Sequence, residues 1–319
     1  MSYREPDPGR IRTVPFSGRR NKVDPSTLAG PPPGPDPSLR RFLESLPDVL
    51  AARDLRAVIT HLARAARGRK GIVLLLGGHV VKVGLGPLVR TWIDRGIVTH
   101  VAMNGAAAIH DFELAAYGGT SEDVEPGLAD GTFGMVEETG REMNAAVAAA
   151  HRERLGMGEG LARALAGRDA LPGRDASILV ACHTSRIPVT VHAALGADII
   201  HQHPTADGEA LGATTLRDFR RLAGSLPGLD GGGAVLNWGS AVMMPEVFLK
   251  ALTVARNLDA GRPTGFLAAD FDMIRHYRPS RNVVQRPTIA GGTGIQLTGH
   301  HEILIPLLVW GVLDALDRA

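Results

Sequence analysis

The sequence predicts a doubly wound, Rossmann-like α/β fold, with a mostly parallel sheet and helices on both of its faces. Three observations lead to it. The chain has 319 residues, of which 44% are hydrophobic, enough for one large core. Short, almost wholly apolar runs such as residues 71–76 are typical of buried parallel strands. Segments with helical periodicity follow these runs, and this alternation is typical of a parallel sheet covered on both sides.

Each expected strand is a short apolar run that ends in glycine or polar residues. The first, residues 71–76, is closed by Gly77 and Gly78. The others follow at intervals long enough to hold a crossover helix, as a parallel sheet requires. The expected strands are residues 71–76, 97–103, 187–192, 234–237 and 266–271.

The expected helices lie between these strands and at both ends of the domain. Ser38 is a suitable N-cap for the first of them. Residues 138–166 are rich in Ala, Glu and Arg and predict helices packed outside the sheet. The remaining helices are expected at residues 38–51, 54–67, 85–95, from about 106, 177–185, 215–223, 241–256 and 302–316.

An N-terminal arm, residues 1–37, is expected to lack regular structure because it is rich in proline and glycine. Residues 38–319 then form a single α/β domain. The arm is interpreted either as a flexible tail or as a segment that wraps a neighbouring subunit. A further alternative is a basic segment that attracts nucleic acid.

Composition excludes several classes of protein. The net charge is only +2 and the basic residues do not cluster, so no nucleic-acid partner is expected. Cys182 is the only cysteine, which rules out an intrachain disulfide and a cysteine-cluster metal site. No apolar run reaches the ~20 residues of a membrane span, and the first residues lack a secretory signal. We therefore expect a cytoplasmic protein with no membrane partner.

The chemistry is expected at the carboxyl ends of the strands, where open parallel sheets bind their ligands. Five segments there combine small residues with polar ones, which favours a ligand that approaches the backbone closely, although each could be only a tight turn. No G-x-G-x-x-G or Walker motif is present. Helix N-termini behind Gly78, Gly105 and Ser240 could bind phosphates. The segments are residues 77–84, 104–113, 192–203, 237–240 and 291–302.

Acidic residues near residue 110 suggest a receptor for a cationic substrate. Asp111 and Glu113 are two residues apart, so both cannot lie on one face of a regular helix. We therefore favour Asp111 acting with Glu122 or Asp123 from the following loop. The alternative is a solvated cluster that caps the helix, because acidic side chains favour helix N-termini.

The histidines allow two interpretations. His201, His203, His110 and the pair His300–His301 are suitable metal ligands, but H-E-x-x-H is absent. General acid/base catalysis by one or two histidines is favoured, since a free histidine titrates near pH 6.5. His301 and His110 are the candidates, with helix capping as the structural alternative for His300–His301.

These motifs resemble the deoxyhypusine synthase superfamily over residues 70–310. Residues 80–84 and 96–107 are similar to that family's helix, strand and nicotinamide-contacting turn, and residues 109–111 fall where it has an acidic pair. Residues 187–198 resemble its "IPV…AL" strand and acidic loop, and residues 236–242 its glycine-rich cofactor turn. The first stretch is also similar to the C-terminal domain of ornithine-cyclodeaminase-type arginine-degrading enzymes.

The resemblance implies a Rossmann-like homotetramer that uses NAD to oxidise a small amine. The family passes a substrate fragment to a lysine near the C-terminus, but no lysine follows Lys250 here. That covalent step, and modification of a translation factor, are therefore not expected. The cofactor contacts expected from the strand-end loops and the resemblance are Gly78, His79, Asn104, Gly105, Asp198, Asn237, Gly239 and Ser240.

The leading hypothesis is an NAD-dependent enzyme that oxidises or rearranges a small amine or amino acid through an imine-type intermediate. The alternatives are a metal-dependent hydrolase or lyase that uses the histidines, and a non-catalytic binding protein. The expected catalytic residues are His301, His110 and Asp111. The expected substrate-binding residues are Asp111, Glu113, Glu122, Asp123, His203 and Glu302.

Overall fold

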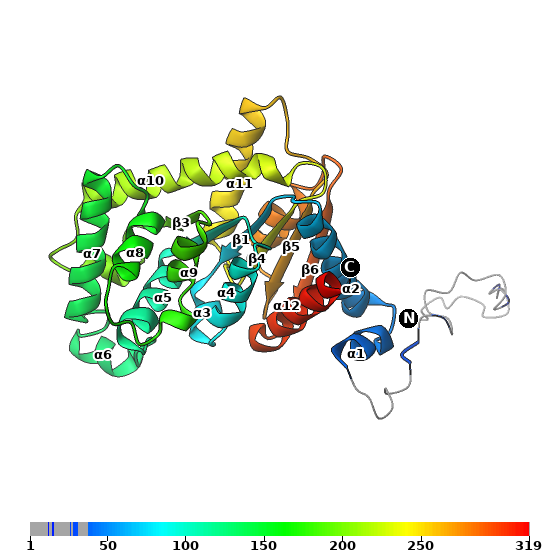
Figure 1. Cartoon of the computed structure of the whole chain (residues 1–319), viewed down its shortest axis with the longest axis horizontal. Coiled ribbons are helices and arrows are strands. Elements are labelled where there is room, and N and C mark those ends of the chain that lie inside the picture. Colours follow the sequence, from blue (N-terminus) through cyan, green and yellow to red (C-terminus); the bar gives the residue numbers. More distant parts are fainter. Residues whose placement is uncertain (1–11, 13–14, 16–25, 27, 31–37, 319) are drawn as a thin grey trace, which may run out of the picture. The chain divides into compact units, whose positions relative to one another are not determined.

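The computed structural model describes residues 12, 15, 26, 28–30 and 38–318 (Figure 1). Contacts divide the chain into two compact units, Met1–Arg53 and Asp54–Ala319. The arm expected over residues 1–37 lies almost wholly outside the described residues, so its role stays a prediction. Among the described residues, no helix has the length and hydropathy needed to cross a membrane.

The first unit contains helix α1, Leu39–Ser45, and the start of α2, Leu50–Arg67. Ser38 caps α1, as expected, by accepting a hydrogen bond from the Arg41 N–H at 3.3 Å. The helix expected over residues 38–51 ends early because Leu46 is extended. Pro47 follows Leu46, and a residue before proline disfavours the helical conformation.

A six-stranded, all-parallel sheet forms the centre of the second unit, which confirms the predicted fold class. The strand order is β3-β2-β1-β4-β5-β6. The strands are β1 Ile72–Leu76, β2 His100–Asn104, β3 Val189–His192, β4 Ala234–Trp238, β5 Leu267–Asp272 and β6 Thr293–Thr298.

Helices cover both faces of the sheet (Figure 1). Longer helices link the strands, and short 3-10 or π segments lie between them. The α-helices of this unit after α2 are α3 Gly78–Lys82, α4 Gly86–Asp94, α5 Gly105–Tyr117, α6 Val124–Asp130, α7 Glu137–Arg152, α8 Met157–Ala166, α9 Ile178–Ser185, α10 Gly208–Ser225, α11 Met243–Leu258 and α12 His301–Asp317. The short segments are η4 Arg174–Ala176, η5 Ile199–Gln202, η6 Leu226–Leu229 and the π-helix η7 Pro279–Gln285.

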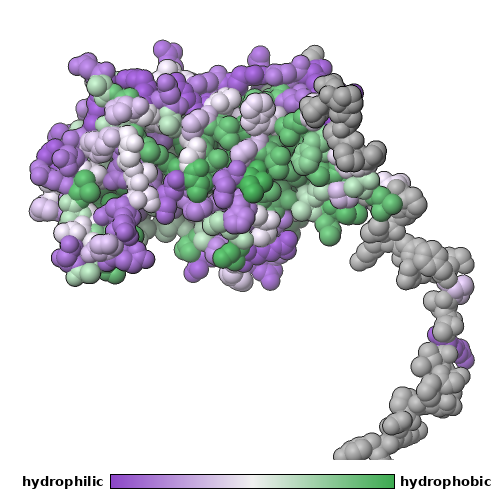
Figure 2. Space-filling view, turned by 90° about the horizontal axis from the view of Figure 1, so that it is seen from below, coloured by the Kyte–Doolittle hydropathy of each residue, from purple (hydrophilic) through white to green (hydrophobic). Residues whose placement is uncertain are grey.

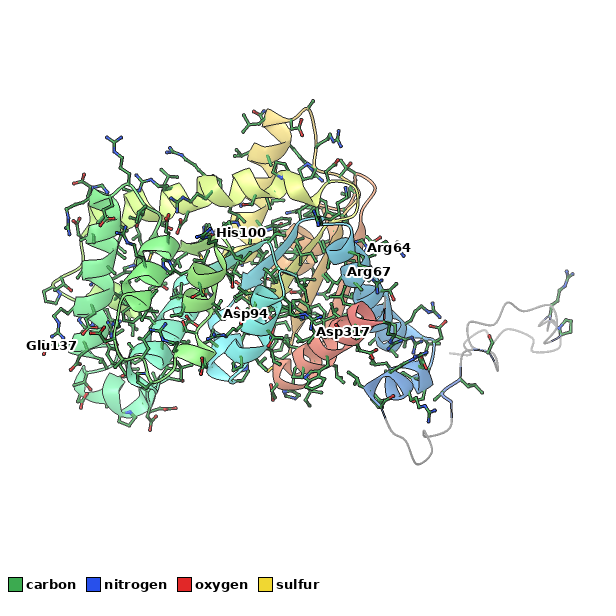
Figure 3. All side chains as sticks on the ribbon, viewed as in Figure 1. Arg64, Arg67, Asp94, His100, Glu137 and Asp317 are labelled. Carbon is green, nitrogen blue, oxygen red and sulfur yellow. The ribbon has the colours of Figure 1, made fainter. Side chains whose placement is uncertain are left out.

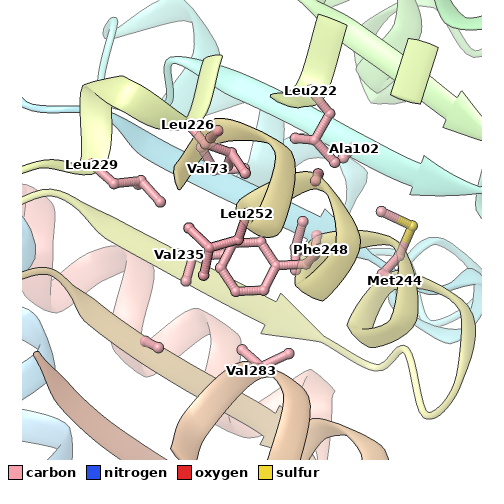
Figure 4. Close-up of a cluster of buried hydrophobic side chains, with 14 of the residues drawn as sticks. Val73, Ala102, Leu222, Leu226, Leu229, Val235, Met244, Phe248, Leu252 and Val283 are labelled. Atoms are coloured by element: carbon pink, nitrogen blue, oxygen red, sulfur yellow. The ribbon is translucent and has the colours of Figure 1, made fainter. Parts of the chain in front are cut away.

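The two faces of the sheet bury different cores because successive side chains on a strand point to opposite sides. On one face, Val73 and Val235 belong to a cluster with Phe248 and Leu252 of α11 (Figure 4). On the other face, Trp238 lies 5.4 Å from the ring of Trp92 in α4. This packing fixes the carboxyl ends of the strands, and so the loops that follow them.

A buried chain of hydrogen bonds joins β2, β3 and α10. His100, marked in Figure 3, contacts Ser225 Oγ through Nδ1 at 2.8 Å and Thr190 Oγ1 through Nε2 at 2.9 Å. Thr190 Oγ1 also contacts His192 Nε2 at 3.0 Å. The Ser225 hydroxyl donates to the Arg221 carbonyl, so it accepts from His100. Burial lowers the pKa of both His100 and His192 to about 3, so both rings are neutral at pH 7.

His100→Gln is expected to make folding less sensitive to acid. The pKa of His100 is about 3 in the folded protein and 6.5 in the unfolded chain. Between these two pH values only the unfolded chain binds this proton, so the stability of the wild type decreases as the pH is lowered. Over this range, the difference in unfolding free energy between the wild type and His100→Gln should change by about 1.4 kcal/mol per pH unit. Urea denaturation at a series of pH values measures it.

Two controls isolate that contribution. The buried carboxyls Asp111 and Asp218, whose pKa values burial raises to about 6 and about 7, are present in both proteins, so they cancel in the difference. Exposed His183, replaced in the same way, should leave the wild-type pH dependence intact. A His100→Gln curve parallel to that of the wild type would show that the buried chain is wrongly described.

Candidate functional site

The order in which the chain adds strands to the sheet reverses between β1 and β4, and we call this place the switch point. From β1 the chain adds β2 and β3 on one side, and then β4, β5 and β6 on the other. In doubly wound sheets this order places the ligand crevice outside the carboxyl ends of the two central strands. The turns after Leu76 and Trp238 therefore border the expected cofactor site.

Glycines in these turns are needed for packing within the protein. A Cβ atom on Gly77 would lie 1.9 Å from the Gly239 carbonyl oxygen. One on Gly78 would lie 3.2 Å from His110 Cδ2, and one on Gly239 would lie 2.9 Å from His301 Cε1. Protein atoms occupy the side of each glycine on which a Cβ would lie, so packing alone requires glycine at these positions; their contact with a cofactor stays a prediction.

The turn after β2 is filled in the same way. Asn104 caps α5 by accepting a hydrogen bond from the Ala107 N–H at 2.8 Å. A Cβ atom on Gly105 would lie 2.0 Å from the Asp198 carboxylate. Both Gly105 and Asp198 were expected to contact the cofactor; the structure brings them together, and they contact each other.

His301 begins α12 and is only 1% exposed. Its Nε2 lies 3.1 Å from the Phe271 carbonyl oxygen, which can only accept, so Nε2 carries the proton. Nδ1 is then an acceptor, and it is buried without a partner among the described residues. The ring lies 5.3 Å from that of His79, whose pKa burial and His301 lower. His301 is thus held inside the fold, behind His79.

Asn237 and Ser240 line the inner side of the β4 turn. The Asn237 amide donates to the Ser240 carbonyl at 3.0 Å and to Asp270 Oδ1 at 2.8 Å. Its own Oδ1, in a residue with 0% exposure, has no partner among the described residues. Ser240 Oγ accepts from the Met244 N–H at 3.1 Å. Asn237 Oδ1 and His301 Nδ1 are therefore unsatisfied acceptors near the switch point.

Asp270 is a polar residue of this site, and it was not among the residues predicted from the sequence. It accepts from Asn237 and, at 2.8 Å, from the Gln296 amide on β6. Burial raises the pKa of its carboxyl. An acidic residue inside the apolar run of residues 266–271 was the available signal.

The Asp111 side chain makes hydrogen bonds within the fold, at the start of α9. It is 0% exposed, and its carboxylate accepts hydrogen bonds from Ser177 Oγ at 2.8 Å, the Ile178 N–H at 2.7 Å and the Leu179 N–H at 2.9 Å. These donors form the N-terminus of α9. Burial raises the pKa of Asp111 to about 6, which leaves it ionised at pH 7. Both oxygens of the carboxylate are therefore engaged by α9, which gives Asp111 a helix-capping role inside the fold; its expected substrate-binding and catalytic roles stay predictions.

Two adjoining cavities lie along α5, the smaller beside its N-terminal half and the larger near its C-terminal end. Their volumes are about 270 and 520 Å³, and both are lined by Glu113, Ser121 and Glu122. We call them together the acidic pocket. The smaller cavity is further lined by Lys82, Ala106, Ile109, His110, Val124, Phe133, Ala197, Asp198 and Ile199. The larger is further lined by Tyr117, Gly119, Thr120, Val136, Glu138 and Thr139.

His110 and Glu113 are linked through Thr120. The Thr120 hydroxyl donates to Glu113 Oε2, so at 2.8 Å it must accept from His110 Nδ1. Nε2 of His110 is then left as the acceptor. Thr139 Oγ1 donates to the other oxygen of Glu113 at 2.9 Å. Burial, aided by the Lys82 charge, lowers the pKa of His110 to about 4, so the ring is neutral at pH 7.

Besides Asp111, three expected substrate-binding residues lie outside the acidic pocket. His203 contacts the Gly134 carbonyl through Nε2 at 2.8 Å, and its ring packs against Gly140. Asp123 begins α6 and is exposed. Glu302 lies on α12 near His300. The acidic pocket gathers two expected substrate-binding residues, Glu113 and Glu122, with the expected catalytic residue His110 and with Asp198, which was expected to contact the cofactor.

The metal interpretation finds no ligand set in the described part of the chain. Within it, no three His, Cys, Asp or Glu side chains gather closely enough to hold a metal ion. His201 Nε2 lies 4.0 Å from Asp198 Oδ2, while His203 is tied to Gly134. The histidines suggested by sequence therefore do not converge.

Comparison with known proteins supports the fold. No family model and no curated protein matches this chain. Solved structures do, among them a putative deoxyhypusine synthase from Entamoeba histolytica, with a TM-score of 0.52, 11% identity, and coverage of 87% of this chain and 93% of that one. This confirms the resemblance expected from the motifs, as a likeness of fold.

Two further solved structures, those of AgrE and ArgZ, also share the fold. AgrE, in a ternary complex with ornithine and NAD+, gives a TM-score of 0.51 at 14% identity over 85% of this chain. Apo ArgZ, an arginine dihydrolase from the ornithine-ammonia cycle in cyanobacteria, gives 0.50 at 15% identity over 83%. The present chain spans only about a third of either enzyme, 35% and 32% respectively.

Proposed function

We propose that this protein is an NAD-dependent enzyme that acts on a small cationic amine or amino acid. The observation that carries the proposal is the charge of the acidic pocket. Four of its lining residues are carboxylates, Glu113, Glu122, Glu138 and Asp198, against the single cation Lys82. Such an excess of negative charge in a concave site favours an ammonium or guanidinium group.

The fit to NAD is supported by strand order and by unsatisfied polar atoms. Asn237 Oδ1 and His301 Nδ1 are buried acceptors beside the switch point, suited to donors such as an amide or a ribose hydroxyl. These residues, with His79, would hold the cofactor, whose chemistry is to take a hydride from the substrate carbon. The likeness of fold to AgrE, which was solved with NAD+ and ornithine, agrees with this assignment.

His110 connects the acidic pocket to the switch point. It lines the pocket, and its ring packs against Gly78, the residue before His79. A substrate whose ammonium group lies at Glu113 would present its neighbouring carbon toward the β1 turn. Within this arrangement Glu113 positions the cation, and His110 Nε2 accepts a proton from it.

Glu113→Gln is expected to weaken binding of a cationic ligand about tenfold. The change keeps the shape and one of the two acceptor oxygens but removes the charge, and one charge-assisted contact is worth about 1.5–3 kcal/mol. Calorimetric titration of L-ornithine and L-arginine measures it. Glu125→Gln, an exposed residue on α6, is the control. Equal losses in both variants would place the ligand elsewhere.

The reaction is tested with NAD+ and a panel of cationic amines: L-ornithine, L-arginine, putrescine and spermidine. Cofactor reduction is followed by absorbance, and products by mass spectrometry, because the hydride can return to the intermediate. We expect turnover of at least one of these cations and none of N,N′-diacetylputrescine, in which acetylation has removed both charges. Binding without any product would leave a non-catalytic binding protein, the alternative considered from sequence.

A homo-oligomer, most simply a tetramer, remains a prediction. Helix α12 is largely apolar between Ile303 and Leu313, and within it Ile303 and Trp310 are 58% and 60% exposed. Helices of this composition are normally buried. Figure 2 shows hydrophobic residues gathered on one face of the molecule. Light scattering of the wild type and of Trp310→Glu should give an oligomer and a smaller species; a wild-type monomer at micromolar concentration would contradict the prediction.

A further inference from the structure

We propose that a second cavity, at the amino edge of the sheet, binds a small organic anion. Its volume is about 680 Å³, within the range of small-molecule sites. We call it the amino-edge cavity. It is lined by Glu159, Ala162, Cys182, His183, Arg186, Ile187, Pro188, Val189, Thr190, Arg221, Gly224 and Ser225.

The amino-edge cavity is separate from the candidate active site. Ile187 and Pro188 immediately precede β3, and the other walls come from the last turns of α9 and α10 and from α8. Parallel strands send their amino ends to the edge opposite their carboxyl ends. A ligand here would not compete with NAD or with an amine in the acidic pocket.

The charges of the lining favour an anion. Two guanidinium groups, Arg186 and Arg221, line the cavity together with one carboxylate, Glu159. Asp218, which does not line the cavity, also lies 4.0 Å from Arg221 Nη1. Arg221 pairs with Glu159 through Nη1 and is 36% exposed, so its other nitrogens remain available. Arg186 is exposed and has no carboxylate partner within the described part of the chain. Guanidinium groups bind carboxylates and phosphates through paired hydrogen bonds.

The remaining walls select for a ligand with an apolar body. Ala162, Ile187 and Val189 give apolar surface, while the hydroxyls of Thr190 and Ser225 belong to the buried chain around His100. The Ser225 hydrogen is committed to the Arg221 carbonyl. The hydroxyls can therefore only accept, and the arginines supply the donors for an anionic group.

The test uses 1-naphthoate, an aromatic carboxylate, as the probe. Its neutral partner, 1-naphthalenemethanol, has the same apolar body without the charge. Calorimetric titration into the full-length protein should show saturable binding of 1-naphthoate. The affinity for the alcohol should be lower by about tenfold or more. Saturating NAD+ and L-ornithine should leave the affinity for 1-naphthoate unchanged.

Arg186→Gly tests the charge with little risk to folding. Arg186 ends α9 with φ of 56°, in the left-handed region that favours glycine. The melting temperature should therefore equal or exceed that of the wild type, while affinity for 1-naphthoate falls about tenfold or more. Arg154→Gly is the matched control, because Arg154 also has a positive φ, 58°, and lies outside the amino-edge cavity.

Gly224→Leu tests the space. A Cβ atom on Gly224 meets nothing within 4 Å, so leucine fits on α10 and partly fills the amino-edge cavity. Gly212→Leu is the control, on the same helix, with equally open space, and away from the cavity. The proposal is overturned if wild-type protein shows no saturable binding, if both members of either pair weaken binding equally, or if NAD+ displaces the probe.

Discussion

His110→Ala is expected to lower turnover of the amine substrate by about 10²–10⁴-fold, the usual size of a general acid/base contribution. His110 lines the acidic pocket, and its tautomer is fixed by Thr120 with Nε2 as the proton acceptor. Because Glu113 still holds the cation, binding of the substrate should change little. Steady-state rates and calorimetric affinities, measured on the same preparation, separate the two quantities.

The pH profile provides a second readout for His110. Its pKa is about 4, and only the neutral ring accepts a proton. This contribution to the rate should rise as pH increases through about 4 and be complete above about 5–6. A free histidine titrates near pH 6.5, and burial lowers the pKa of His110 from that value.

Variants of Thr120 distinguish positioning from general disruption. Thr120→Ser keeps the hydroxyl that links His110 to Glu113 and should retain most of the activity. Thr120→Val keeps the shape, removes that link, and should lower turnover without abolishing it. If His110→Ala retains near-normal turnover while His301→Ala loses it and stays folded, the proton acceptor is His301.

Asp111→Ala is expected to destabilise the protein by about 3–5 kcal/mol. The change leaves three buried donors without an acceptor, and each unsatisfied group costs about 1–3 kcal/mol. The start of α9 loses the carboxylate that its N-terminus favours. The free energy of unfolding, measured by urea denaturation, should fall accordingly.

Asp123→Ala is the matched control for this prediction. Asp123 also lies at the start of a helix, but it is exposed and its side chain makes no capping hydrogen bond. Its loss should change stability by no more than about 0.5 kcal/mol. A stable Asp111→Ala protein that no longer binds a cationic amine would restore the role first expected for this residue.

The sequence predicted the central strands well because they are buried on both faces. Such strands are continuous apolar runs, and β1, β4 and β5 were located from them. The edge strand β6 was missed: Thr293–Thr298 alternates exposed and buried residues and contains a glycine, so it was interpreted as part of a loop. Edge strands carry only half of the apolar signal.

The glycines show why a local pattern does not identify a ligand site. Gly77 and Gly239 lie at the switch point, as expected for a cofactor turn, but each makes room for another part of the protein. A tight turn against a ligand and one against a neighbouring segment require the same residue. Only the position of the second segment, far away in sequence, separates the two cases.

The same limit applies to Asp111. Helical periodicity places it on the face of α5 that carries Ala108, Phe112 and Ala115, and this was the available signal for burial. Its partners begin at Ser177, 66 residues away, and no local pattern identifies them. By contrast, His110 and Glu113 are close in sequence to Thr120, which links them, and both were predicted as site residues.

NAD+ titrated into the wild-type protein, and followed by calorimetry at fixed salt and pH, is expected to bind saturably. Asn237→Leu removes the unpartnered acceptor at the switch point together with the two hydrogen bonds of the amide, and should weaken NAD+ binding in protein that stays folded. Glu113→Gln in the acidic pocket should leave NAD+ binding unchanged. No measurable heat and no saturable binding by the folded wild-type protein would contradict the assignment as an NAD-dependent enzyme.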